Sequence, residues 1–233
     1  MSFERYYSNV NTTLLEVVQP HAQRICEFGC GAGAFARAVK QRCDQVHYVG
    51  VELMASQLAL ADDVLDVGLV RNLDQMQDWT LDAELSQALP LDSFDHVIFG
   101  DVLEHLYDPQ AALKQAVMRL KPEGSALVCI PNVQHWSVIQ QILKGSWPQT
   151  DNGIFDRTHL RWFALSDMLA LMENSGLRVT KIVPRISRRL SPEHGAPFTA
   201  TLEQSCRFLG IDHQQFMKLS TPSQYVLVGT RKT

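Results

Sequence analysis

Three glycines at alternate positions follow an apolar stretch near the start of the chain. Residues 25–28 suit a buried strand, and residues 34–39 have helical composition without a further breaker. Between them, Gly29, Gly31 and Gly33 let the backbone turn tightly and let a ligand approach the main chain. The N-terminus of a helix offers unpaired N–H groups and the positive end of the helix dipole. This segment therefore predicts a seat for the phosphate or carboxylate of a cofactor.

The glycine spacing fits two classes of cofactor. Gly29-x-Gly31-x-x-Ala34 matches the fingerprint of dinucleotide-binding turns. Glu27-x-Gly29-x-Gly31-x-Gly33 instead resembles motif I of class I S-adenosylmethionine (SAM)-dependent methyltransferases. The carboxylate of Glu27 can bind a cationic amino group, which SAM has and a pyrophosphate lacks. The turn thus favours SAM, and an NAD-dependent oxidoreductase is the alternative.

Further polar residues follow the next two predicted strands, 46–52 and 66–71. Glu52 is placed to hold both ribose hydroxyls of an adenosine-containing cofactor, a role that serves NAD and SAM equally. A glutamate that caps the following helix is the alternative. In methyltransferases an acidic or amide residue after the third strand often meets the adenine amino group. Asn72 or Asp74 is expected there, with an ordinary loop as the alternative.

Later segments carry a more specific resemblance. The run FDHVIFGDVLEHLYDP at 94–109 looks like the segment after the fourth strand in ubiquinone-biosynthesis-type and sugar-modifying class I methyltransferases. The turn LKPEG at 120–124 is also common in methyltransferases. The pattern PNVQHW…KGSW…GIFDRTHLRWF, within 131–163, resembles bacterial methyltransferases that modify surface polysaccharides and glycans. The chain is identified as a member of the class I SAM-dependent methyltransferases on these motifs, which lie within 24–184.

This resemblance implies additional contacts with SAM from the glycine turn and from the segments that follow the second and fourth predicted strands. They are expected at Cys30, Leu53, Asp101 and Val102. The sequence Asp101-x-x-Glu104-His105 also resembles the metal-binding cluster of some ubiquinone-pathway methyltransferases, which have Glu at the first position. Because this chain has Asp there, we assign no metal from the sequence.

Two histidines are candidates for the base that takes the proton of an acceptor hydroxyl. The sulfonium of SAM already activates its methyl group, so the protein mainly aligns a nucleophile and removes water. Imidazole is the side chain best matched to neutral pH. His105 follows the fourth strand, whose carboxyl end borders the cofactor crevice. His159 follows Asp156 by three residues, so on a helical turn that carboxylate would orient its ring. The alternative for each histidine is a packed structural role.

Cationic and aromatic residues of the same region can bind the acceptor. Arg157 and Arg161 suit an anionic acceptor such as a nucleotide-sugar phosphate, or a structural salt bridge. Trp136, with Trp147 and Trp162, can stack on a sugar or pack in a lid. The sequence therefore predicts O-methylation of a sugar, glycan or small hydroxylated metabolite. A non-catalytic SAM-binding partner protein, suggested by methionine-biosynthesis relatives, is a further alternative.

Strands and helices alternate along the chain, which predicts an α/β, doubly wound, Rossmann-like sheet. We expect a single SAM-dependent methyltransferase domain over 1–233. The resemblance implies seven strands, with the last one antiparallel beside the sixth. A leading helix is expected within 1–22, and a helical and loop insertion on the substrate side at 133–163, after the fifth strand. That insertion is expected to select the acceptor.

Composition narrows the remaining possibilities. With 233 residues, 45% hydrophobic and 20% charged, the chain is in the range of one globular domain. Five cysteines without a C-x-x-C pair, and a start without an apolar signal core, predict reduced thiols in the cytoplasm. No window approaches about 18 consecutive apolar residues, so no membrane span is expected. A net charge of −4 argues against a nucleic-acid partner, whereas a homodimer is allowed.

Overall fold

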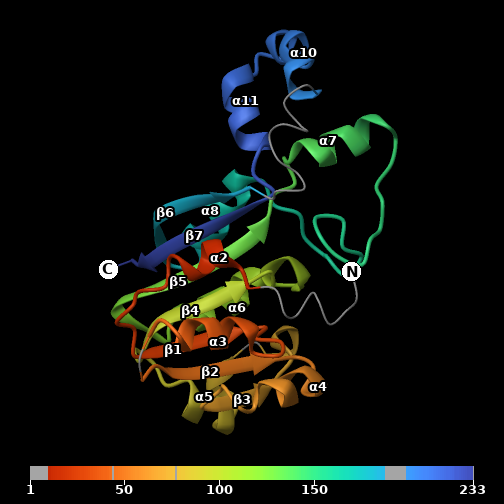
Figure 1. Cartoon of the computed structure of the whole chain (residues 1–233). Helices are drawn as coiled ribbons and strands as arrows, with labels where there is room; N and C mark the ends of the chain where they lie inside the picture. The colour runs from red at the N-terminus through yellow and green to blue at the C-terminus, as the bar shows by residue number, and fades with distance from the viewer. Residues whose placement is uncertain (1–9, 44, 77, 187–197, 233) are drawn as a thin grey trace.

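The chain is built around one seven-stranded sheet (Figure 1). The structure is a computed structural model that describes residues 10–43, 45–76, 78–186 and 198–232. The strands lie in the order β3-β2-β1-β4-β5-β7-β6. Their bounds are β1 Arg24–Phe28, β2 His47–Glu52, β3 Val67–Val70, β4 Phe94–Gly100, β5 Leu120–Pro131, β6 Leu177–Arg185 and β7 Gln224–Arg231.

Six strands run in one direction and the last one, β7, runs in the opposite direction. β1 to β5 pair in parallel, whereas β7 pairs antiparallel with both β5 and β6. Strands buried on both faces read as nearly continuous apolar runs, as β4 does. The predicted Rossmann-like sheet with an antiparallel last strand beside the sixth is therefore confirmed.

Short helices connect the strands. The α-helices are α2 Thr12–Leu15, α3 Ala34–Lys40, α4 Ala55–Leu58, α5 Ala83–Ala88, α6 Pro109–Val117, α7 Trp136–Leu143, α8 Leu165–Asn174, α10 Glu203–Phe208 and α11 His213–Ser220. The 3₁₀ turns are η1 Ala59–Ala61, η2 Leu73–Gln75, η3 Trp79–Leu81 and η4 Leu103–His105. None of the helices in these ranges is long and apolar enough to cross a membrane.

Two elements differ from the sequence prediction. Of the leading helix expected within 1–22, only α2 is helical among the described residues, and 1–9 lie outside them. The chain tightens after α2, where Val17 N–H and Val18 N–H donate to carbonyls three residues back. The turn expected at 120–124 lies inside β5, at the point where its pairing with β4 shifts register. Between Leu120 and Ser125 this strand has three more residues than β4 has between Phe94 and His96, and a Cβ at Gly124 would lie 3.0 Å from the backbone nitrogen of Lys121, so the chain turns there within the range of β5.

The core has one layer on each face of the sheet. In β4, Val97 and Phe99 pack into one buried cluster and Ile98 into the other, as the two-residue period of a strand requires. The first cluster lies under α6 and α8, and the second under α3. This sandwich fixes the carboxyl ends of β1, β2 and β4 against one another.

A group of helices lies beyond the carboxyl end of β5. Figure 1 shows α7, α10 and α11 gathered there, apart from the helices that flank the sheet. Buried Asn132, just after β5, ties this group to the sheet. Its side-chain Nδ2 donates to the carbonyls of Leu219 at 2.9 Å and Pro222 at 2.8 Å. The segment 144–163 then returns across the end of β4.

Candidate functional site

The glycine turn after β1 is close-packed. Gly29, Gly31 and Gly33 all have positive φ, of 73°, 51° and 75°. A Cβ atom at Gly29 would lie 2.5 Å from Val102 Cγ2, and one at Gly33 would lie 2.7 Å from Val64 Cγ1. Only glycine satisfies both the backbone conformation and this packing. The turn thus brings bare backbone to the carboxyl edge of the sheet.

Glu27 provides a buried carboxyl beneath this turn. The hydroxyl of Tyr48 donates to Glu27 Oε2 at 2.9 Å. Burial raises the pKa of Glu27 to about 8, the nearby Glu52 adds to the rise, and the bond from Tyr48 opposes it. A buried carboxyl whose pKa is raised in this way is stabilised as an anion by an added cation. The site therefore fits the cationic amino group of SAM.

Glu52 braces the turn from the end of β2. Its Oε2 accepts from Gly31 N–H at 2.9 Å, and its Oε1 accepts from Met54 N–H at 2.9 Å. The capping alternative is thus part of its role, since Met54 is the N-cap residue of α4. Each carboxylate oxygen retains a second lone pair, so both ribose hydroxyls can still be received.

The other predicted cofactor residues lie around the same edge. Val102 packs on Gly29, whereas Leu53 is 61% exposed beside Glu52. The Cys30 side chain is buried against β2, so only its backbone is offered to a ligand.

The loop after β3 reaches the loop after β4. Asn72 Oδ1 caps η2 by accepting from Asp74 N–H at 3.0 Å. Asp74 Oδ1 accepts from Tyr107 N–H at 2.8 Å. Both predicted adenine contacts therefore also have a structural role, and they place the loops that border the crevice.

Asp101 follows β4 with strained backbone. Its φ is 59°, in the left-handed region that a non-glycine residue rarely adopts. Gln224 Nε2 donates to Asp101 Oδ1, and Arg185 Nη1 donates to Gln224 Oε1. Burial raises the pKa of Asp101 to about 6, against the opposing charge of Arg185. Strain of this kind clusters at functional sites because the surrounding fold must enforce it.

A carboxyl and two imidazoles meet beside Asp101. Glu104 is 1% exposed, and both of its carboxyl oxygens lack a hydrogen-bond partner among the described residues. His159 Nε2 lies 3.9 Å from Glu104 Oε1, and the rings of His105 and His159 meet edge to face with centroids 4.7 Å apart. Burial raises the pKa of Glu104 well above its usual range. Burial also lowers the pKa of His105 and of His159, which keeps their imidazoles neutral near pH 7.

The predicted partnership between Asp156 and His159 is wrong in its geometry. The segment forms a turn, not a helix, and Asp156 Oδ1 accepts from the N–H and hydroxyl of Thr158 at 2.8 and 2.6 Å. His159 Nδ1 donates to the carbonyl of Ile154 at 3.3 Å. The carboxyl nearest to this imidazole is that of Glu104, on a different element. Asp156 instead orients Thr158, which contacts His105 Nδ1.

Arginines near this cluster are held by the loops. Arg161 Nη2 donates to the Tyr107 carbonyl at 2.8 Å, and Arg157 forms an exposed ion pair with Asp151 at 2.7 Å. Arg157 therefore forms a salt bridge, as the structural alternative expects, and Arg161 has a structural hydrogen bond.

The indole groups separate into buried and exposed ones. Trp136 is buried in α7 at 9% exposure. Trp147 and Trp162 are 40% and 45% exposed and meet edge to face, with ring centroids 5.5 Å apart. The open aromatic surface of the insertion is therefore the Trp147–Trp162 corner.

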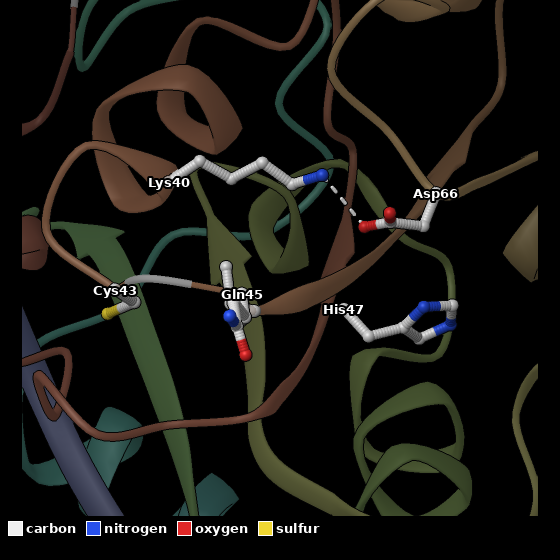
Figure 2. A pocket seen from close by; sticks show the side chains of 6 residues that line it. Lys40, Cys43, Gln45, His47 and Asp66 are labelled. Carbon is white, nitrogen blue, oxygen red and sulfur yellow. Dashed lines mark hydrogen bonds and ion pairs between the residues drawn. The ribbon is translucent and has the colours of Figure 1, made fainter.

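A hollow of about 360 Å³ lies away from all of these groups. It is lined by Lys40, Gln45, His47 and Asp66 among others, at the amino end of β2 (Figure 2). Lys40 and Asp66 neutralise each other across it at 2.8 Å. Ligands of doubly wound sheets bind at the carboxyl ends of the strands, so this hollow is not at the edge where a cofactor or acceptor is expected.

Sequence reasoning missed Tyr48 and Gln224 and gave Glu104 no role. Tyr48 lies on β2, two positions before Gly50, which is the residue that pairs with Glu27. Its hydroxyl reaches Glu27 because β1 and β2 are neighbouring strands. Gln224 reaches Asp101 from the start of β7, far along the chain. The signals for Glu104 in the sequence were its place beside His105 in the run VLEHL at 102–106 and the resemblance of 101–105 to a metal-binding cluster.

Comparison with known proteins agrees with this geometry. A family model described as "Methyltransferase domain" matches residues 3–182. The ubiquinone biosynthesis O-methyltransferase of Aeromonas salmonicida is 24% identical over 76% of this chain and 68% of its own length. That of Stutzerimonas stutzeri is 30% identical, over 44% of this chain and 41% of its own length.

A solved structure shares the fold. It is a SAM-dependent methyltransferase from Thermotoga maritima, described as a possible histamine N-methyltransferase. Its TM-score is 0.63 at 18% identity, covering 99% of this chain and 95% of that one. The NAD-dependent alternative is therefore set aside: the chain belongs to the methyltransferase-domain family and is a SAM-dependent methyltransferase.

Proposed function

We propose that this enzyme transfers the methyl group to a hydroxyl oxygen of a sugar, a glycan or a small hydroxylated metabolite. The observation that carries the proposal is the cluster of Glu104, His105 and His159 at the carboxyl end of β4. Neutral imidazoles at that edge can receive the proton that a hydroxyl must lose. The name of the Aeromonas salmonicida relative, an O-methyltransferase, supports the same atom type.

The cofactor is held by the turn side of the crevice. In this proposal Glu27 binds the amino group of SAM, Glu52 binds the ribose hydroxyls, and Asn72 or Asp74 meets the adenine. Backbone groups of Gly29 to Gly33, with Leu53, Asp101 and Val102, complete the seat. When bound, SAM supplies a methyl group already activated by its sulfonium.

The acceptor is handled by the insertion side. Bound SAM would supply the methyl group to the acceptor oxygen and leave as S-adenosylhomocysteine, and Nε2 of His105 or His159 would receive the proton that the acceptor hydroxyl loses. Nδ1 of each ring already donates to a backbone carbonyl, which fixes this tautomer. Asp156 acts indirectly, through Thr158. Exclusion of water by the loop 144–163 would favour the transfer.

The outer part of the insertion would bind the rest of the acceptor. The Trp147–Trp162 corner offers open aromatic surface for one face of a sugar ring, and Trp136 supports the wall from α7. Arg157 and Arg161 lie in the same segment and suit an acidic group. Because Arg161 N–H donates to the Glu104 carbonyl at 3.0 Å, this surface is tied directly to the cluster.

We expect this activity in the cytoplasm. Its partner would be a small-molecule or glycan substrate. The side chains of all five cysteines are buried, which supports a reducing compartment. A homodimer is the assembly we expect, and light scattering of the purified protein would measure it.

The test is methyl transfer from isotopically labelled SAM to a panel of sugars, phenols and amines. We expect O-methylated products, and a fall of about 10²- to 10⁴-fold in kcat for His105→Gln with unchanged affinity for S-adenosylhomocysteine. His47→Gln, at the opposite edge of the sheet, is the control. Methylation of amines alone would contradict the choice of oxygen. Tight SAM binding without transfer to any acceptor would instead support a non-catalytic partner protein.

A further inference from the structure

We propose that Tyr48 is a positioning residue for SAM, because its hydroxyl holds one oxygen of the Glu27 carboxyl and leaves the other oxygen to the amino group of the cofactor. The hydroxyl donates to Glu27 Oε2 at 2.9 Å. No hydrogen bond from another described residue reaches Glu27 Oε1, so that oxygen can receive a cationic N–H group. This role rests on the proposed function, in which Glu27 binds the amino group of SAM.

The pairing of β1 with β2 brings these two side chains together. Glu27 lies opposite Gly50, and Tyr48 precedes Gly50 by two positions. Because the side chains of a strand alternate between its faces, Tyr48 projects from the same face of the sheet as Glu27. The length of the phenol ring carries its hydroxyl diagonally across to the neighbouring strand. A phenylalanine at this position would keep the ring and remove only the donor.

Both the ring and the backbone of Tyr48 are fixed. The side chain is 0% exposed and belongs to the buried cluster that contains Phe35 and Val39 of α3. Tyr48 N–H donates to Asp66 Oδ2 at 2.7 Å, and the Tyr48 carbonyl accepts from Asp66 N–H at 2.9 Å. Lys40 Nζ donates to the same carboxylate oxygen at 2.8 Å (Figure 2). The ion pair beside the hollow at the amino end of β2 thus anchors Tyr48, and a rigid strand sets the direction of its hydroxyl.

Tyr48 also stabilises the Glu27 anion electrostatically. Burial raises the pKa of Glu27 to about 8, the bond from Tyr48 opposes this rise, and the nearby Glu52 adds to it. The thiols of Cys26 and Cys30 interact with the same carboxyl. Burial raises the pKa of both thiols and of the Tyr48 hydroxyl, so these three groups keep their protons near neutral pH. Loss of the Tyr48 hydroxyl should therefore raise the pKa of Glu27 further and leave fewer anions at pH 7 to receive an amino group.

The test compares two ligands of Tyr48→Phe by calorimetry at pH 7. S-adenosylhomocysteine carries the amino group, whereas 5′-methylthioadenosine has the same nucleoside and sulfur without it. We expect affinity for S-adenosylhomocysteine to fall by about 10-fold or more, as loss of a hydrogen bond to a charged group implies. Affinity for 5′-methylthioadenosine should stay within about twofold. Tyr225→Phe, which removes another buried phenol hydroxyl, should bind both ligands as the unaltered protein does.

The loss in Tyr48→Phe should depend on pH with a definite sign. The bond from Tyr48 favours the Glu27 anion, so its contribution to affinity is complete at a pH below the pKa of Glu27 and fades as pH rises through that pKa. At about pH 9 we expect Tyr48→Phe and the unaltered protein to differ by less than about threefold. In a Glu27→Gln background, Tyr48→Phe should cause no further loss, because the two residues act as one unit.

Three results would overturn the positioning role of Tyr48. They are an unchanged affinity for S-adenosylhomocysteine in Tyr48→Phe, an equal loss for both ligands, and a loss that is as large at pH 9 as at pH 7. An equal loss for both ligands would show that Tyr48 only supports the fold.

Glu27→Gln separates this inference from the proposed function. If Glu27→Gln weakens S-adenosylhomocysteine and Tyr48→Phe does not, the role of Tyr48 alone is wrong. If Glu27→Gln leaves the affinity unchanged, Glu27 does not bind the amino group, and its place in the proposed function fails together with the role of Tyr48.

Discussion

The cofactor turn and the acceptor cluster lie at the same edge of the sheet but are built differently. The turn, residues 27–33, is one short segment held by backbone bonds, such as Gly29 N–H to the Val51 carbonyl at 2.7 Å. The acceptor cluster joins η4 to residues 154–161 through Glu104, His105 and His159. The residues of the turn thus come from one contiguous segment, whereas the acceptor cluster is assembled from two segments far apart in the chain.

Because the two halves of the crevice are built differently, sequence changes in each half should affect a different property of the enzyme. The turn is fixed by φ and by close packing, so it accepts little variation and defines the methyl donor. The cluster depends on where a long insertion returns to the sheet, so a change in the insertion can alter the acceptor without disturbing the turn. Variants of the two halves should therefore affect different measured quantities.

The largest effect is expected at Gly33. Gly33→Ala forces a side chain into φ 75° and into Val64 and Ala61, so affinity for S-adenosylhomocysteine should fall by about 100-fold or more. Stability should fall by about 2–4 kcal/mol in urea unfolding. Gly145→Ala is the matched control, because Gly145 has φ 70° and a Cβ added there would meet no heavy atom within 4 Å. Equal losses in both variants would show that packing at the turn is unimportant.

Glu52→Ala should weaken the cofactor by a smaller amount. It removes the acceptor for Gly31 N–H and Met54 N–H and the predicted ribose contact, for a loss of about 1–3 kcal/mol in binding. Calorimetry with S-adenosylhomocysteine measures it, and Glu123→Ala, on the exposed part of β5, is the control. Unchanged affinity would refute the assignment of Glu52.

Glu27 should make cofactor binding depend on pH. Its pKa of about 8 means that the carboxyl of the free protein is mostly protonated at pH 7, whereas a bound amino group favours the carboxylate. Binding should therefore release a proton, and affinity should fall by up to about tenfold per unit as pH drops from 7 to 6. Calorimetry in buffers of different ionisation enthalpy counts that proton. Glu27→Gln should abolish its release, and proton uptake by the unaltered protein would contradict the assignment.

The smallest effect is expected at the aromatic corner. Trp147→Ala should raise the acceptor KM by roughly 2- to 12-fold, as loss of an aromatic contact worth about 0.5–1.5 kcal/mol implies, with kcat and cofactor affinity unchanged. Trp147→Phe should restore most of the loss. If kcat falls while KM stays constant, the corner shapes the catalytic cluster and does not bind the acceptor.

The same contrast explains how far the sequence could be read. The turn was predictable because Glu27, the glycines and the strand 24–28 are contiguous, and their spacing dictates their conformation. Alternation of strands and helices indicated the fold class, and the resemblance implied the antiparallel last strand beside the sixth. Which carboxyl would face His159 was not predictable: the chain spacing pointed to Asp156, whereas the return of 154–161 across η4 brings Glu104 instead. Likewise, nothing local in β7 indicates that Gln224 meets Asp101.

The most direct test of the two-part crevice measures donor binding and methyl transfer separately in two variants. His105→Gln should keep the Kd of S-adenosylhomocysteine within about twofold while single-turnover methyl transfer falls by at least about 100-fold. Gly33→Ala should lose donor affinity by a similar factor, and saturating SAM should restore much of its transfer rate. If His105→Gln instead lost donor affinity and transfer rate together, the two halves would form a single unit and the account would be wrong.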